Sequence, residues 1–194
     1  MHFGTPRFEG DSMVAGLSYD KATSTANRVY DWRSDFINAD VNGNSGARLE
    51  SVLLFSKPSQ TPIIVLFAGF NNVKHLDETE DSVIAAYSKT FAELQQRSKA
   101  IYCVGIPPIV HAKSDSWYPE GATITNTRIL NINSRIETLC GAGYIDTPSF
   151  WTEEDTDDGI HPNNQGYRKI SGELKRQKLI VFWVWLSDLI VWGS

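Results

Sequence analysis

The sequence has few cysteines and no excess of positive charge. Its two cysteines, Cys103 and Cys140, are too few for a disulfide framework or a metal cluster, and we expect no metal and no cofactor. Both lie in apolar surroundings, which favours buried free thiols over a disulfide. A net charge of −5 and a pI near 5.3 leave no basic surface for nucleic acid or for an anionic membrane.

A hydrophobic run long enough to cross a membrane is also missing. The first ten residues lack the apolar core of a signal peptide, and the compartment stays open. The segment KLIVFWVWLSDLIVW (178–192) is strongly apolar, but it is shorter than the ~20 residues of a membrane span, and Asp188 interrupts it. We expect residues 1–177 to form one domain and the C-terminal tail, 178–194, to pack on it. Self-association through the tail and contact with a membrane surface are the alternatives.

Two common glycine motifs are absent as well. The chain has no Gly-x-Ser-x-Gly elbow, which argues against the α/β-hydrolase arrangement of a nucleophilic serine. It also has neither a P-loop nor a Gly-x-Gly-x-x-Gly pattern, so nothing supports an α/β protein that binds a phosphorylated ligand.

What the sequence does contain is the pattern of an α/β domain. Hydrophobic residues make up 41% and charged residues 21%, as in ordinary globular proteins. Short apolar runs alternate with segments of helical period, which predicts β-α-β units and a mostly parallel sheet. We expect strands within 36–41, 62–70, 100–110 and 144–151, and helices within 77–98, 125–143 and 164–177. The first strand is the weakest prediction, because "PRFEG" (6–10) is too polar and too short for a typical central strand.

Four polar or glycine-rich segments follow the predicted strands. In an open parallel sheet the carboxyl ends of the strands share one edge, so loops far apart in the sequence can meet there. The four segments are Asp11-Ser12, "NGNSG" (42–46), "GFNN" (69–72) and "DDGIHPN" (157–163). Taken alone, each is ordinary turn chemistry.

Ser12 needs a base before it can act as a nucleophile, and His161 is the best candidate. In "DDGIHP" a glycine turn can bring the Asp158 carboxylate to one ring nitrogen of His161, which leaves the other nitrogen free for Ser12. The simpler interpretation of His161 is a histidine in a surface loop. The other three histidines, His2, His75 and His111, have no such carboxylate pattern beside them.

Acyl transfer also requires donors for the developing oxyanion. Gly43 and Gly46 allow the tight backbone conformations that present N–H groups, and Asn71 offers a side-chain amide at the end of the 62–70 strand. Each is more often a simple turn residue, but together they match what acyl transfer needs.

The four segments together resemble the GDSL esterases, or SGNH hydrolases, in their order and in their spacing. The resemblance covers nearly the whole chain and implies a three-layer α/β/α sandwich with about five parallel strands. It implies Ser12 as nucleophile and oxyanion donor, Gly46 and Asn71 as further oxyanion donors, His161 as base and Asp158 as its orienting acid. One departure is Asn72, where the family usually has an aspartate. The polar run before Ser12 is another.

We therefore expect a metal-independent serine esterase acting on small acyl esters, such as acetyl groups on carbohydrate, short-chain esters or a thioester. The alternative is a binding or scaffolding protein on the same fold with impaired catalysis. The pocket loops, within 17–35 and 111–126, hold aromatic residues that can stack on sugars, which favours a carbohydrate ester, although packing in the core is an equally good interpretation of any one of them. These residues are Tyr19, Trp32, Trp117 and Tyr118.

Overall fold

The computed structural model describes residues 5–20, 23, 25–74, 78–114 and 126–191, with side chains up to residue 177. A five-stranded sheet with the order β4-β1-β5-β6-β7 lies at the centre, and every pair of neighbouring strands is parallel. The strands are β1 (Pro6–Gly10), β4 (Asp40–Gly43), β5 (Thr61–Phe67), β6 (Ser98–Val104) and β7 (Tyr144–Ile145). The predicted parallel sheet is thus confirmed.

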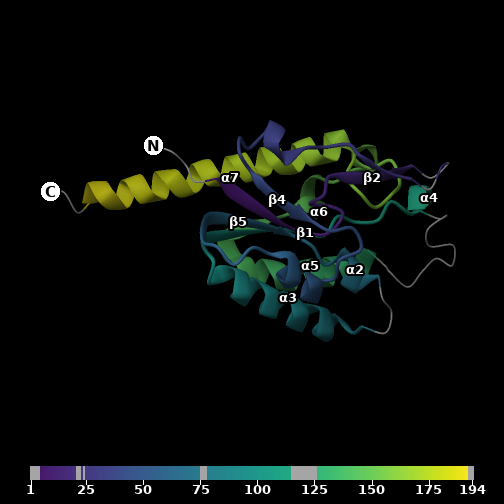
Figure 1. Ribbon diagram of the computed structural model, residues 1–194, viewed down its shortest axis with the longest axis horizontal. Helices are drawn as coiled ribbons and strands as arrows, with labels where there is room; N and C mark the ends of the chain where they lie inside the picture. The colour runs from purple at the N-terminus through teal and green to yellow at the C-terminus, as the bar shows by residue number, and fades with distance from the viewer. Residues whose placement is uncertain (1–4, 21–22, 24, 75–77, 115–125, 192–194) are drawn as a thin grey trace.

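Helices cover both faces of this sheet, which makes the predicted three layers (Figure 1). Helices α3 and α5 lie on one face and α7 runs along the other. The helices are α1 (Leu49–Phe55), α2 (Phe70–Val73), α3 (Glu80–Gln95), α4 (His111–Ser114), α5 (Asn126–Cys140), α6 (Thr147–Phe150) and α7 (Asn164–Val191), with short 3-10 turns η1 (Trp32–Ser34), η2 (Gly141–Gly143) and η3 (Glu153–Asp155). The three predicted helices are present as α3, α5 and α7.

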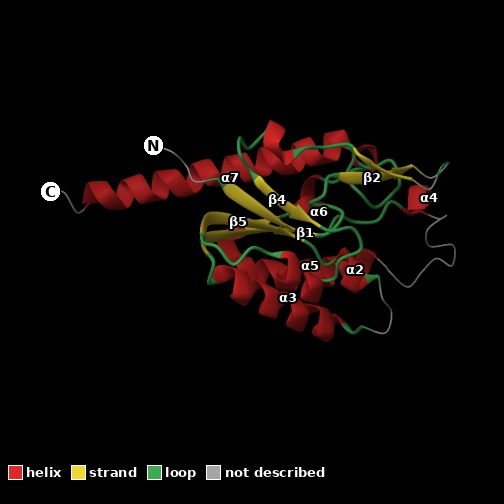
Figure 2. Cartoon of the chain, in the orientation of Figure 1, coloured by secondary structure: helices red, strands yellow, loops and turns green. Residues whose placement is uncertain are grey.

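A small antiparallel hairpin stands apart from the main sheet in Figure 2. It consists of β2 (Leu17–Asp20) and β3 (Thr25–Arg28) and follows directly after the turn that contains Ser12. The hairpin was not predicted from the sequence, because its strands have four residues each and β3 is exposed and polar.

Strand β1 is polar and short, yet it lies inside the sheet between β4 and β5. Its side chains alternate between the two faces. Phe8 stacks on Trp32 with ring centroids 4.4 Å apart.

The residues that flank Phe8 in β1, Arg7 and Glu9, are also buried. The Arg7 guanidinium donates to Lys57 O and to Ser59 O, and Glu9 accepts from Ser56 Oγ at 2.9 Å and from Asn42 Nδ2 at 2.7 Å. Burial of these charges is tolerated because each is hydrogen-bonded.

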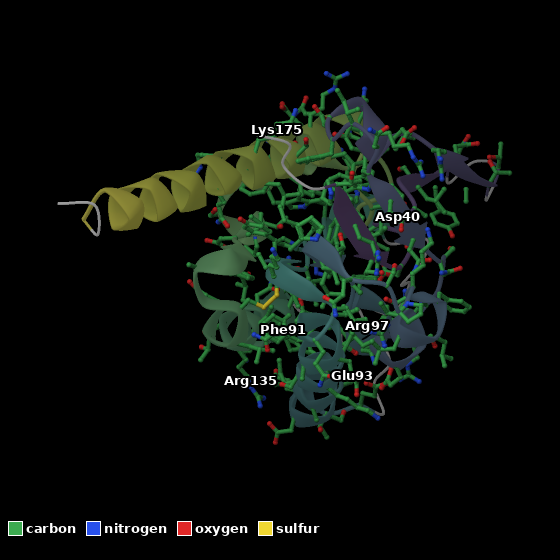
Figure 3. The ribbon with its side chains drawn as sticks, turned by 60° about the vertical axis from the view of Figure 1, so that its left-hand side comes forward. Asp40, Phe91, Glu93, Arg97, Arg135 and Lys175 are labelled. Atoms are coloured by element: carbon green, nitrogen blue, oxygen red, sulfur yellow. A yellow bond between two sulfur atoms is a disulfide. The ribbon has the colours of Figure 1, made fainter. Side chains whose placement is uncertain are left out.

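The two cysteines form a disulfide, so the prediction of free thiols was wrong. Cys103 lies near the end of β6 and Cys140 ends α5, and their Sγ atoms are joined (Figure 3). Helix α5 packs on β6, which brings the two Cα atoms to 6.3 Å. Apolar surroundings correctly indicated burial of Cys103, but burial does not distinguish a thiol from a disulfide.

The segment 36–41 was predicted as a strand, but pairing begins only at Asp40. Phe36 instead turns its ring toward Phe8, with the centroids 5.4 Å apart, and Asn38 takes a left-handed conformation with φ 63°. A residue in this conformation interrupts an extended strand. Strand β4 therefore begins later than predicted and ends at Gly43, within the glycine-rich segment 42–46.

The predicted helix 164–177 is confirmed and continues as α7 to Val191, so most of the C-terminal tail is helical. Figure 1 shows the later part of α7, coloured yellow, running past the sheet. The side chains of 178–191 lie outside the described part of the chain, so the packing of the tail on the domain and its self-association both stay predictions. No helix among the described residues is long and apolar enough to cross a membrane.

Candidate active site

Ser12 lies in a tight turn immediately after β1. The turn is closed by hydrogen bonds from Ala15 N to Asp11 O and from Leu17 N to Ser12 O. Gly10 permits the close packing of this strand end, because a Cβ atom there would lie 2.0 Å from Phe67 O on β5. Ser12 is therefore fixed at the carboxyl edge of the sheet, as predicted.

The structure brings Ser12 and His161 together across 149 residues of sequence. Ser12 Oγ lies 2.9 Å from His161 Nε2, and His161 Nδ1 lies 2.7 Å from Asp158 Oδ2. The three side chains form one continuous hydrogen-bonded row. Such a row allows a hydroxyl to lose its proton to the ring while the carboxylate stabilises the resulting imidazolium.

The loop 157–163 holds the Asp158 carboxylate against Nδ1 of the imidazole ring. Its second oxygen, Oδ1, accepts from Ile160 N at 2.8 Å and from His161 N at 2.7 Å. Gly159 makes this turn possible with φ +84°. Burial acts to raise the pKa of the Asp158 carboxyl, but the hydrogen bonds from His161 and Ile160 outweigh it and hold the pKa below its usual value. Asp158 is accordingly a carboxylate at neutral pH.

The two further donors predicted for the oxyanion border the same space as Ser12. Gly46 follows β4 with φ +76°, and Asn71 lies on α2 after β5. Ser12, His161, Gly46 and Asn71 all line one cavity of about 140 Å³. The Asn71 amide donates to Ala47 O at 3.0 Å and to Asp11 Oδ2 at 3.3 Å, so it is anchored in the cavity wall.

Tyr19 connects the hairpin to both sides of the cavity. Its hydroxyl lies 2.8 Å from Ser45 Oγ, beside Gly46, and its ring centroid lies 4.8 Å from that of His161. Its backbone N–H donates to Asp158 Oδ2 at 3.2 Å. Of the other aromatic residues predicted near the site, Trp32 is in the core, and Trp117 and Tyr118 lie outside the described residues.

Asp11 and Lys74 are further ionisable groups near Ser12, and no role was predicted for either side chain from the sequence. Asp11 does not line the cavity. Asp11 is completely buried behind Ser12, and this burial raises the pKa of its carboxyl to about 6, although the Met13 N–H, His161 and Lys74 act in the opposite direction. Lys74 lines the cavity. Burial lowers the pKa of its ammonium, and the Asp11 carboxylate opposes that shift. Neither residue has a motif that marks it, apart from the position of Asp11 next to Ser12.

Asn72, the departure from the family pattern, is fully buried and fully hydrogen-bonded. Its Oδ1 accepts from Leu49 N at 2.9 Å, in the first turn of α1. Its Nδ2 donates to the carboxylates of Glu50 at 3.1 Å and Glu78 at 3.3 Å. An asparagine suits this position because its amide oxygen accepts a hydrogen bond, while its N–H₂ group donates hydrogen bonds to two carboxylates.

Comparison with known proteins agrees with the fold. No curated protein matches the chain. Among solved structures, a carbohydrate acetylesterase from Sinorhizobium meliloti is 14% identical with a TM-score of 0.69, covering 91% of this chain and 98% of its own. A GDSL-like lipase from Bacteroides thetaiotaomicron is 19% identical with a TM-score of 0.66, and the match covers 89% of this chain and 86% of the lipase. An acetylxylan esterase from Geobacillus stearothermophilus is 14% identical with a TM-score of 0.63, and the match covers 91% of this chain and 96% of the esterase.

The model of the GDSL-like lipase/acylhydrolase family matches residues 8–169, a range that includes the turn at Ser12, the loop at Gly46, helix α2 and the 157–163 loop. The chain therefore belongs to the GDSL-like lipase/acylhydrolase family.

Proposed function

We propose that this protein is a serine esterase that hydrolyses small acyl esters through an acyl-enzyme intermediate. The observation that carries the proposal is the row of hydrogen bonds from Ser12 Oγ to His161 Nε2, 2.9 Å, and from His161 Nδ1 to Asp158 Oδ2, 2.7 Å. A serine hydroxyl becomes a useful nucleophile at neutral pH when a base accepts its proton in this way.

In the first half of the reaction, Ser12 Oγ attacks the ester carbonyl as its proton passes to His161 Nε2. The negative charge that develops on the carbonyl oxygen is stabilised by the N–H groups of Ser12 and Gly46. The Asn71 amide is the third donor, and for this it exchanges one of its two hydrogen bonds, to Ala47 O or to Asp11 Oδ2, for one to the oxyanion. The intermediate collapses, and the leaving alcohol takes the proton from His161. In the second half, water attacks the acyl group on Ser12 with His161 as base, and the acid and the free hydroxyl are released.

The cavity favours a small substrate. A volume of about 140 Å³ suits an acetyl or short acyl group better than a long chain. Tyr19, which lines the cavity, presents an aromatic ring of the kind that stacks on sugars. The structural neighbours include a carbohydrate acetylesterase and an acetylxylan esterase. We therefore place O-acetylated carbohydrates first among the candidate substrates.

The alternative, a binding protein with impaired catalysis, loses its two supports. The polar β1 is a regular central strand, and Asn72 is hydrogen-bonded on both sides of its amide. Neither feature disturbs Ser12 or His161 in the structure.

The direct test compares wild type, Ser12→Ala and Ser134→Ala in the hydrolysis of p-nitrophenyl acetate. Ser134 is an exposed serine of α5 and controls for the loss of a hydroxyl as such. We expect Ser12→Ala to lower kcat by roughly 10³-fold or more, as losses of catalytic serines do. A fluorophosphonate should label Ser12, as located by peptide mass spectrometry. Full activity of Ser12→Ala, or labelling elsewhere, would exclude the assignment. A panel of acetylated sugars, short-chain esters and thioesters then ranks the substrates.

A further inference from the structure

Lys74 brings a positive charge to the cavity that contains the proposed catalytic groups. It follows α2 directly, three residues after Asn71, so the two side chains share one side of this short helix. Both line the cavity of about 140 Å³ together with Ser12 and His161. Among the residues that the structure describes, the lining consists of Ser12, Tyr19, Ser45, Gly46, Phe70, Asn71, Lys74, Ile160 and His161, and none of these is a carboxylate.

The ion pairs of the described residues leave Lys74 without a partner. The neighbouring cation Arg48 is paired with Glu78, and the lysines Lys57 and Lys169 are paired with Asp40 and Asp155. Asp11 is the carboxylate that acts on Lys74 electrostatically, but its oxygens are directed to Met13 N at 2.9 Å and to the Asn71 amide at 3.3 Å. The half-buried Lys74 therefore has no ion-pair partner within the described part of the chain, and it lines the cavity.

A partly buried charge without a paired counter-charge loses hydration and gains no ion pair in return. The cost is recovered when a ligand of opposite charge enters the cavity. A cation in a site otherwise lined by neutral groups also attracts anions and disfavours cations during encounter. Three observations therefore favour an anionic ligand: the position of Lys74 at the cavity, and, within the described part of the chain, the lack of an ion-pair partner for it and of a carboxylate in the lining.

We propose that the Lys74 ammonium binds a carboxylate of the substrate, so that the ester hydrolysed at Ser12 is an anionic one. This inference rests on the proposed esterase function and specifies its substrate class. In a cavity of this size, the carboxylate lies within a few bonds of the scissile carbonyl. It belongs either to the acyl group, as in a half-ester of a dicarboxylic acid, or to the alcohol, as in an acetylated acidic sugar.

Two matched pairs of esters distinguish these sources. The p-nitrophenyl half-ester of succinic acid and p-nitrophenyl butyrate differ by a charge in the acyl group. Acetoxybenzoate and its methyl ester differ by a charge in the leaving group. For each pair, the ratio of kcat/KM for the charged ester to that for the neutral ester is measured in wild type, Lys74→Met, Lys74→Arg and Lys89→Met. Lys89 is an exposed lysine of α3 and serves as the matched control.

We expect Lys74→Met to lower this ratio by about tenfold in at least one pair, the effect of losing one charge-assisted hydrogen bond in a partly solvated site, mainly through KM. Lys74→Arg should retain most of the preference, and Lys89→Met should match wild type. Added salt should reduce the ratio in wild type more than in Lys74→Met. Because the ratio compares two esters in the same variant, a general loss of activity cancels.

If the ratio in both pairs is the same in wild type and Lys74→Met while hydrolysis depends on Ser12, the Lys74 proposal is wrong and the esterase function stands. If Ser12→Ala hydrolyses all four esters as fast as wild type, the esterase function is wrong and the Lys74 proposal falls with it.

Discussion

Asp158 holds His161 at two points, with one carboxylate oxygen on the ring and the other on the backbone. The Oδ2–Nδ1 and Oδ1–N distances are both 2.7 Å. The residue that orients the ring therefore also shapes the loop that carries it. Since the side chain and the backbone of His161 share one anchor, the tautomer and the position of the ring are set together.

Replacing Asp158 with asparagine separates these two tasks. In Asp158→Asn the amide oxygen can still accept from the backbone of the loop, but the amide N–H₂ then faces the ring and favours the wrong tautomer. We expect kcat for p-nitrophenyl acetate to fall by roughly 10³–10⁴-fold with the fold retained by circular dichroism. The exposed neighbour Asp157→Asn is the control. Activity of Asp158→Asn within tenfold of wild type would show that this carboxylate is dispensable.

Asp11 makes stability depend on pH in the weakly acidic range. Its carboxyl has a pKa of about 6 in the folded protein, against 3.8 for the ordinary group, because it is buried. Between these values the folded state binds more protons than the unfolded state, so the contribution of Asp11 to the free energy of unfolding falls as pH rises and is constant above about 6.

We therefore expect the difference in unfolding free energy, Asp11→Asn minus wild type, to rise by about 2 kcal/mol between pH 4.5 and 7 and then level off. Urea denaturation at several pH values measures it. Any fixed cost of the amide shifts this curve without changing its slope. Asp81→Asn, at an exposed position on α3, should give a flat difference. A flat difference for Asp11→Asn too would show that this carboxyl titrates normally.

We expect the aspartate that the family usually has at position 72 to destabilise this protein. In Asn72→Asp a third carboxylate would face those of Glu50 and Glu78, and the two N–H donors would be lost. We expect a loss of about 1–3 kcal/mol in unfolding free energy, seen as a lower Tm.

Adding Glu50→Gln to Asn72→Asp restores a donor and removes one charge, so part of the lost Tm should return. The same Asn→Asp change at the exposed Asn131 is the control. A Tm of Asn72→Asp equal to that of wild type would mean that the neighbouring carboxylates do not constrain this position.

The disulfide between Cys103 and Cys140 closes a loop with a sequence separation of 37 residues. The loss of chain entropy in the unfolded state predicts a stabilisation of about 3–4 kcal/mol for a loop of this size. Reduction should therefore lower the Tm of wild type, and the double variant Cys103→Ala/Cys140→Ala should have a lower Tm that no longer responds to reductant. A Tm that does not change on verified reduction would contradict the expected stabilisation.

The proposed site was largely predictable because its parts are local and its assembly is topological. Asp158 and His161 are three residues apart in one glycine turn, so the sequence alone indicates their contact. Ser12 meets His161 because both follow strands of a parallel sheet, whose carboxyl ends share an edge. Both steps need only the strand pattern and the loop residues.

The features that were not predicted from the sequence depend on contacts between residues that are distant in the chain. The charges of β1 are stabilised by groups 33 to 52 residues away, such as Asn42 and Ser59, so its composition gave no sign of a central strand. Tyr19 reaches Ser45 only through a hairpin without a clear strand pattern. Lys74 has no motif, and its place at the cavity follows from the three-dimensional course of α2.

The order of the proposed catalytic residues along the chain has a consequence for biosynthesis. Ser12 follows β1, the first strand of the sheet in the chain, and is synthesised before His161 and its anchor Asp158, which come after β7, the last strand of the sheet. A nascent or truncated chain that ends before residue 161 has the serine without its base. Esterase activity would then appear only once the whole sheet is complete, and its onset would report the completion of folding during translation.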